Sequence, residues 1–123
     1  MVHGVHLRKA AELLTAAKWP DSIRESINAV ESVARVLEPT GDFSKALVRL
    51  EGSAKIHGAL KKGFGSIYGF TSDEKGIRHP LLDDSTSAVD EYDALFMIGA
   101  CAAFVSYLIN KASAAGLLEP EQQ

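Results

Sequence analysis

The amino-acid sequence predicts a single all-α domain built as a bundle of five helices. Apolar residues recur at helical spacing in five segments, and no segment shows the alternation of apolar and polar residues that marks a half-buried strand. The chain has 123 residues, enough for one hydrophobic core, and 46% of them are hydrophobic. We therefore expect one domain over residues 1–118 and a flexible tail over 119–123.

The first two predicted helices lie on either side of Pro20. We expect the first to span residues 5–17 and to end before this proline, because the residue that precedes a proline avoids helical backbone angles. Ser22 and Glu25 have the spacing of a capping box, with Asp21 as a competing cap, so we expect the second helix to begin there. Five apolar residues then recur at helical spacing: Ile23, Ile27, Val30, Ala34 and Leu37.

Two shorter helices and a long one follow. The third is expected over residues 43–51 and the fourth over 56–68, where glycines weaken the helix and leave packing to hold it. The last helix is the longest, over residues 88–114, with Gly116 as its stop. Acidic residues in its first turns and a lysine near its end match the helix dipole: Asp90, Glu91, Asp93 and Lys111.

The last helix contains an apolar stretch at residues 94–109. This stretch is shorter than the roughly 20 residues that a membrane span needs. We interpret it as part of a buried central helix that forms the core together with the second and fourth helices. Cys101, with apolar neighbours, is expected to be a small buried hydrophobic residue. Four small residues allow another helix to approach closely, either within the chain or at a dimer seam: Gly99, Ala100, Ala102 and Ala103.

Composition argues against several classes of function. The formal net charge of −3 gives no global basic field for nucleic acid. One cysteine cannot form an intrachain disulfide, and no secretory signal is recognisable, so we expect a cytoplasmic protein. The histidines and Cys101 lack the spacing of a zinc site, and the sequence has no P-loop, dinucleotide fingerprint or nucleophile elbow. We expect neither a metal nor a cofactor.

The predicted loop at residues 69–87 is the strongest candidate for chemistry, because long loops in compact domains are usually functional or disordered. Gly76 and Pro80 would shape it, so that it presents Arg78 and His79 in a fixed way. A histidine moves protons near neutral pH, and an arginine binds phosphate oxygens by paired hydrogen bonds. Alternatively, Arg78 pairs with a nearby acidic residue and His79 caps a helix.

Glu31 is a second candidate. It belongs to a polar stripe on the second predicted helix, made of Arg24, Asn28, Glu31 and Arg35. Such a stripe is usually a solvated face with internal ion pairs. The functional alternative is a carboxylate that orients the loop histidine.

A third candidate is a basic segment at residues 43–66, which has five basic residues against Glu51 alone, a local net charge of +4. Lys55, Lys61 and Lys62 are its candidate phosphate- or RNA-binding residues. The alternative is that these are ordinary solvated lysines.

Three segments together resemble a known family. They are DSIRESINAVESVARVL at residues 21–37, GFGSIYGFTSDEKGIRHPLLDD at 63–84, and FMIGACAAFVSYLI at 96–109. They look like the C-terminal domain of AbiJ-like abortive infection proteins, which is similar to the HEPN superfamily of helical domains in antiphage and toxin systems. The segment SDEKGIRHP in its helical setting is the most distinctive part of this resemblance.

The resemblance implies a HEPN-like five-helix bundle that forms a homodimer and, in active members, cleaves RNA without a metal. The family motif is an arginine followed by a histidine after four to six intervening residues. His79 matches the histidine; Ser72 stands where six intervening residues would place the arginine, and Arg78 directly precedes His79. His79 would act as acid and base, Arg78 as phosphate ligand, and Glu31 would match a polar position on the second helix.

We therefore expect a domain of a phage-defence protein that binds RNA or nucleotide, with metal-independent ribonuclease activity as its candidate reaction. An additional domain or a partner protein is compatible with this prediction. We expect no association with a membrane. The alternative is a non-catalytic dimerisation or regulatory module.

Overall fold

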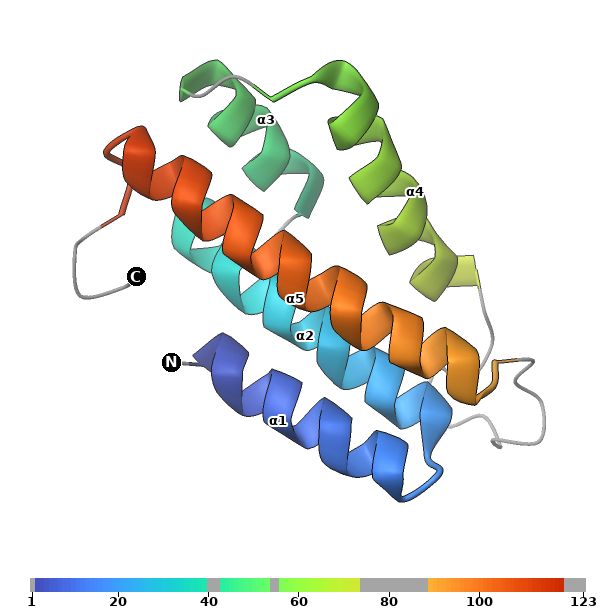
Figure 1. The fold of residues 1–123 in the computed structure, drawn as a ribbon. Coiled ribbons are helices and arrows are strands. Elements are labelled where there is room, and N and C mark those ends of the chain that lie inside the picture. The colour runs from blue at the N-terminus through green and yellow to red at the C-terminus, as the bar shows by residue number, and fades with distance from the viewer. Residues whose placement is uncertain (1, 40–42, 54–55, 74–88, 119–123) are drawn as a thin grey trace.

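The computed structural model describes residues 2–39, 43–53, 56–73 and 89–118, and these fold into five α-helices without a strand (Figure 1). The all-α five-helix prediction is confirmed. The helices are α1 (Val2–Thr15), α2 (Trp19–Leu37), α3 (Phe43–Ser53), α4 (Gly58–Asp73) and α5 (Glu91–Ala114). The tail expected at residues 119–123 lies outside the described residues.

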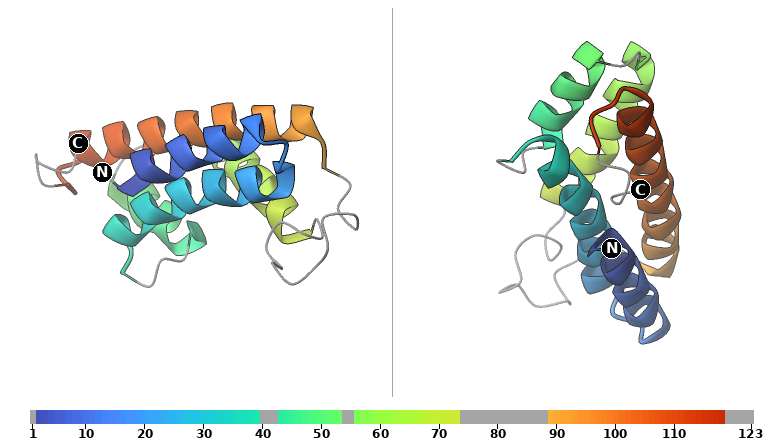
Figure 2. Two further views of the ribbon diagram at one scale, coloured as in Figure 1. Left: turned by 90° about the horizontal axis from the view of Figure 1, so that it is seen from below. Right: turned by 90° about the vertical axis from the view of Figure 1, so that its left-hand side faces the viewer.

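The core is built around α2, which packs against each of the other four helices. Helices α1, α2 and α5 run side by side, and α3 and α4 cover the core on the side away from α1 (Figures 1 and 2). The prediction that the last helix is central is wrong. Ten residues of α2 are buried, whereas α5 buries one side and exposes Tyr92, Leu95 and Phe96 on another.

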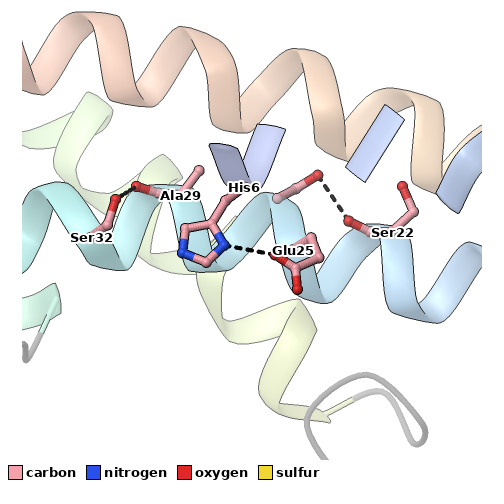
Figure 3. Close-up of polar contacts among 6 residues, drawn as sticks. His6, Ser22, Glu25, Ala29 and Ser32 are labelled. Carbon is pink, nitrogen blue, oxygen red and sulfur yellow. Dashed lines mark hydrogen bonds and ion pairs between the residues drawn. The ribbon is translucent and has the colours of Figure 1, made fainter. Parts of the chain in front are cut away.

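The predicted capping box at the start of α2 is also wrong, because both of its residues contact α1 instead. The Ser22 hydroxyl donates to the Ala10 carbonyl at 2.7 Å, and the His6 ring bonds through Nδ1 to Glu25 Oε2 at 2.7 Å (Figure 3). The helix begins three residues earlier, at Trp19, with a proline in its first turn. Proline is well suited to that position because the first N–H groups of a helix have no partner within the helix.

The loop after α1 is closed by a residue in the left-handed region. Ala17 has a φ of 60°, its N–H donates to the Leu14 carbonyl, and the Lys18 N–H donates to the Leu13 carbonyl. This is the Schellman arrangement, in which the left-handed position usually holds glycine. Helix α5 ends in the same way at Gly116, with a φ of 74°, so the predicted stop there is confirmed.

The boundaries of α4 and α5 differ from prediction at both edges of the intervening segment. Helix α4 continues to Asp73, so the first five residues of the predicted loop are helical, and the Thr71 side chain within them is fully buried. Asp90 is the N-cap of α5 rather than part of it. Its Oδ1 accepts from the Tyr92 and Asp93 backbone N–H groups, and its own N–H donates to Asp93 Oδ2, each at 3.0 Å. This capping box fixes where α5 begins.

Helix α5 is long and apolar enough to cross a membrane by length and composition alone. It has 24 residues, and its most apolar window has a mean hydropathy of 1.7 and is 33% buried. The core helix of a soluble protein passes the same test of length and composition, so this feature assigns no location. Cys101 is fully buried in this helix, as predicted, and its burial raises the pKa of the thiol to about 12.

Candidate functional site

Of the predicted site residues, the structure describes Glu31, Lys61 and Lys62. Five others lie outside the described residues: Lys55, Gly76, Arg78, His79 and Pro80. The described elements on either side of residues 74–88 are the end of α4 and the N-cap of α5.

Glu31 is held by α4 and is not part of a purely solvated stripe. Its Oε2 accepts a hydrogen bond from the Tyr68 hydroxyl at 2.8 Å, and the carboxylate is half-buried. The Tyr68 ring stacks on buried Phe43, with ring centroids 4.5 Å apart and an angle of 16° between the planes. Three helices therefore meet at this contact. Glu31 thus holds the C-terminal part of α4 through Tyr68, which lies five positions before the last residue of that helix, Asp73.

The remainder of the polar stripe behaves differently. Arg24 pairs with Asp21 on the same helix, with Nη1 and Oδ1 2.7 Å apart. Such a pair, partly open to water, contributes little to stability. Arg24 thus makes an ion pair within its own helix, while Glu31 makes a tertiary contact. Sequence reasoning missed Tyr68, because no local pattern links two residues 37 positions apart.

A basic groove lies between α3 and α4. It has a volume of about 400 Å³, and Lys61 and Lys62 both line it, opposite Ser44 and Val48 of α3. Lys62 is exposed, and Lys61 is 3.2 Å from Glu51 through its ammonium group. Lys45 and Arg49 are also exposed on α3, but they do not line this groove. The structure thus brings Lys61 and Lys62 together at one wall of what we call the α3–α4 groove.

A second, larger groove of about 750 Å³ lies on the other side of the Glu51–Lys61 ion pair. Tyr107 and Lys111 of α5 line it together with His57. The Lys111 ammonium is 5.7 Å from the centre of the Tyr107 ring, a cation–π distance. His57 Nδ1 accepts from the Ala59 backbone N–H at 3.0 Å and so caps the start of α4. The Glu51 carboxylate also lines this second groove, so it holds both an acidic and a basic side chain.

The described residues contain no group of three or more His, Cys, Asp or Glu side chains placed to hold a metal ion. The chemistry that these residues offer is the binding of anions by lysine and arginine, together with a positioned carboxylate.

Comparisons of the chain with family models, with curated proteins and with solved structures found no match. The resemblance to HEPN domains therefore stays a prediction from the quoted segments.

Proposed function

We propose that the chain is a HEPN-like domain of a phage-defence protein and that it binds the phosphates of RNA or nucleotide in the α3–α4 groove. The observation that supports this most directly is that Lys61 and Lys62 both line that groove. A phosphate backbone is bound largely by such cationic groups, which displace its condensed counterions. A net charge of −3 does not oppose this, because the positive charge is concentrated locally.

The proposed reaction is metal-independent cleavage of RNA. His79 transfers the proton between the ribose 2′-hydroxyl and the leaving oxygen, and Arg78 stabilises the charge on the phosphoryl group. Glu31 serves as a positioning residue, because its bond to Tyr68 fixes the helix that leads into the segment with Arg78 and His79. The lysines of the α3–α4 groove bind other phosphates of the same RNA strand, at a distance from the bond that is cleaved.

Binding is tested with a fluorescently labelled single-stranded RNA, by anisotropy across a series of salt concentrations. The variant K61A/K62A should bind more weakly and reduce the slope of log affinity against log salt by about 1.4, or about 0.7 per lost phosphate contact. The matched control is K9A/K18A, which removes two exposed lysines from the α1 side of the molecule. Equal weakening in both double variants would show that only net charge matters and would overturn the groove assignment.

Cleavage is tested separately with total cellular RNA in the presence of a chelator. Wild-type protein should cleave the RNA, and His79→Ala and Arg78→Ala should each abolish cleavage while circular dichroism shows an unchanged helix content. Cleavage that survives in His79→Ala would contradict the catalytic assignment. Binding without cleavage in the wild type would leave only the binding part of the proposal standing.

A second candidate function, a non-catalytic dimerisation or regulatory module, is favoured by a different observation. Tyr92, Leu95 and Phe96 of α5 are exposed on one side of the helix, where apolar side chains gain by being covered. This candidate predicts self-association without RNA binding.

A further inference from the structure

The exposed side of α5 is continuous, and its N-terminal half is apolar. Tyr92, Leu95 and Phe96 are 75%, 57% and 59% exposed, and their spacing of three and four residues places them on one side of the helix. Four further exposed positions continue the same side towards the C-terminus at helical spacing. We call the whole set the α5 outer face: Tyr92, Leu95, Phe96, Gly99, Ala103, Ser106 and Asn110.

Packing within the chain does not account for the small residues of this face. A Cβ atom built on Gly99 meets no atom within 4 Å, and Ala103 is exposed. Cys101, in contrast, lies on the buried side of the same helix. Of the two explanations that the sequence leaves open for the small residues, close packing within the chain does not apply at Gly99 and Ala103. Their small size leaves room for a helix from outside.

We propose that the α5 outer face binds the same face of a second copy of this chain, with the two α5 helices antiparallel. The charges of α5 stand only at its ends: Glu91 and Asp93 in the first turn, and Lys111 in the last. No charged residue lies between residues 94 and 110. A parallel pair would bring the two acidic ends together, whereas an antiparallel pair places each acidic end beside the lysine end of the other copy. The antiparallel pair also opposes the helix dipoles favourably.

The outer face suggests a register for this pair. When Gly99 lies opposite the partner's Ala103, the twofold axis passes level with Cys101, and the two helix axes can approach closely. Asp93 and Lys111 both lie on the edge of α5 that faces α4. Asp93 lines a groove together with Phe70 of α4. Lys111 lines a groove together with Leu60 of α4. Because a twofold axis brings like edges of an antiparallel pair together, Asp93 lies beside the partner's Lys111. The same register places Tyr92 opposite the partner's Asn110.

This inference develops the dimerisation candidate and does not depend on RNA binding. Its first test is sedimentation velocity of the full chain over about a hundredfold range of concentration. The wild type should change from monomer to dimer. Gly99→Leu should stay monomeric, because leucine adds apolar surface but prevents close approach of the helices. The control is Gly63→Leu on α4, where a Cβ also meets nothing within 4 Å; it should dimerise like the wild type.

Orientation is tested by cross-linking. Tyr92→Cys and Asn110→Cys place single reactive thiols on the outer face, about 27 Å apart along one helix. Cys101 stays buried in both variants. On mild oxidation of a mixture, antiparallel dimers should give the mixed 92–110 disulfide, and a parallel pair would give only the 92–92 and 110–110 products.

Three outcomes overturn the proposal. The first is a monomer at every concentration, and the second is a dimer that Gly99→Leu leaves unchanged. The third is binding to zwitterionic phospholipid vesicles that Gly99→Leu does not weaken, because that result would assign the face to a membrane. RNA affinity is measured on the same variants, so that a failure of self-association is not confused with a failure of the RNA proposal.

Discussion

At the scale of single residues, polar side chains of α2 hold the neighbouring helices α1 and α4 in place. Ser22 and Glu25 bond to α1, and Glu31 bonds to Tyr68 of α4. Each bond joins residues at least 12 positions apart. Buried or half-buried polar groups require partners, since an unpaired one retains its desolvation cost. These contacts therefore restrict the packing of α1 and α4 to one arrangement against α2.

The Tyr68 hydroxyl should contribute measurably to stability. Tyr68→Phe keeps the ring on Phe43 but removes the donor to Glu31, and we expect the free energy of unfolding to fall by about 1–2 kcal/mol. Urea denaturation followed by circular dichroism measures the change. Tyr107→Phe is the matched control, because the Tyr107 ring also makes an aromatic contact, with Phe64, and its hydroxyl makes no hydrogen bond to another residue that the structure describes. Equal losses in both variants would contradict a specific role for the Glu31 bond.

Ala17 occupies a position that favours glycine. Because a side chain in the left-handed region costs about 1–2 kcal/mol, Ala17→Gly should raise the free energy of unfolding by about 1 kcal/mol. The converse substitution, Gly116→Ala, should lower it by about the same amount. Thermal and urea denaturation measure both. A destabilised Ala17→Gly protein would show that the gain in chain entropy of the unfolded state outweighs the relief of strain.

At the scale of elements, α3 stabilises the core through one side while the other side stays available for binding. Phe43, Leu47 and Leu50 are buried, whereas Val48 is 58% exposed and lines the α3–α4 groove. Helices α3 and α4 each pack on α2. The groove between them thus rests on a shared support and can bind a ligand without opening the core.

This division of α3 is testable with neighbouring substitutions. Leu50→Ala should lower the free energy of unfolding by about 2–5 kcal/mol, because Leu50 is fully buried and its truncation leaves a cavity. Val48→Ala should change it by less than about 0.5 kcal/mol. The pair is compared by urea denaturation at one protein concentration. A large effect at Val48 would mean that α3 packs with both faces in solution.

At the scale of the whole molecule, the two proposed interaction surfaces differ in chemistry. Two lysines line the α3–α4 groove, whereas the α5 outer face carries large exposed apolar side chains and no charged residue. The first depends on attraction to phosphates, which salt screens, and the second depends mainly on burial of apolar surface, which moderate salt leaves intact. Salt should therefore separate them.

Raising the sodium chloride concentration from about 0.05 M to about 0.2 M should weaken RNA binding by at least about tenfold. The logarithm of the affinity should fall linearly with the logarithm of the salt concentration, with a slope proportional to the number of phosphate contacts. Over the same range the dimer dissociation constant should change by less than about threefold. Anisotropy and sedimentation velocity measure the two constants on one preparation. Parallel loss of both would indicate that self-association is electrostatic or that RNA bridges the copies.

Helical periodicity in the sequence sufficed for the number and order of the helices. The predicted start of α2 is wrong because Ser22 and Glu25 fit a local capping pattern but bond to α1. The predicted end of α4 is wrong because Thr71 is buried by tertiary packing, which a local pattern does not show. The position of Lys61 and Lys62 side by side was predictable from the sequence, since neighbouring residues stay neighbours in space. The partner of Glu31 was not, because it lies on another helix.

The sequence by itself determined the all-α class, the five helices, the burial of Cys101 and the stop at Gly116, because these follow from periodicity and from the backbone preferences of single residues. Only the tertiary structure decided that α2 rather than α5 is central, and that Gly99 faces open space. An apolar stretch records how much surface favours burial, but which side of a helix is covered depends on the helices that pack against it.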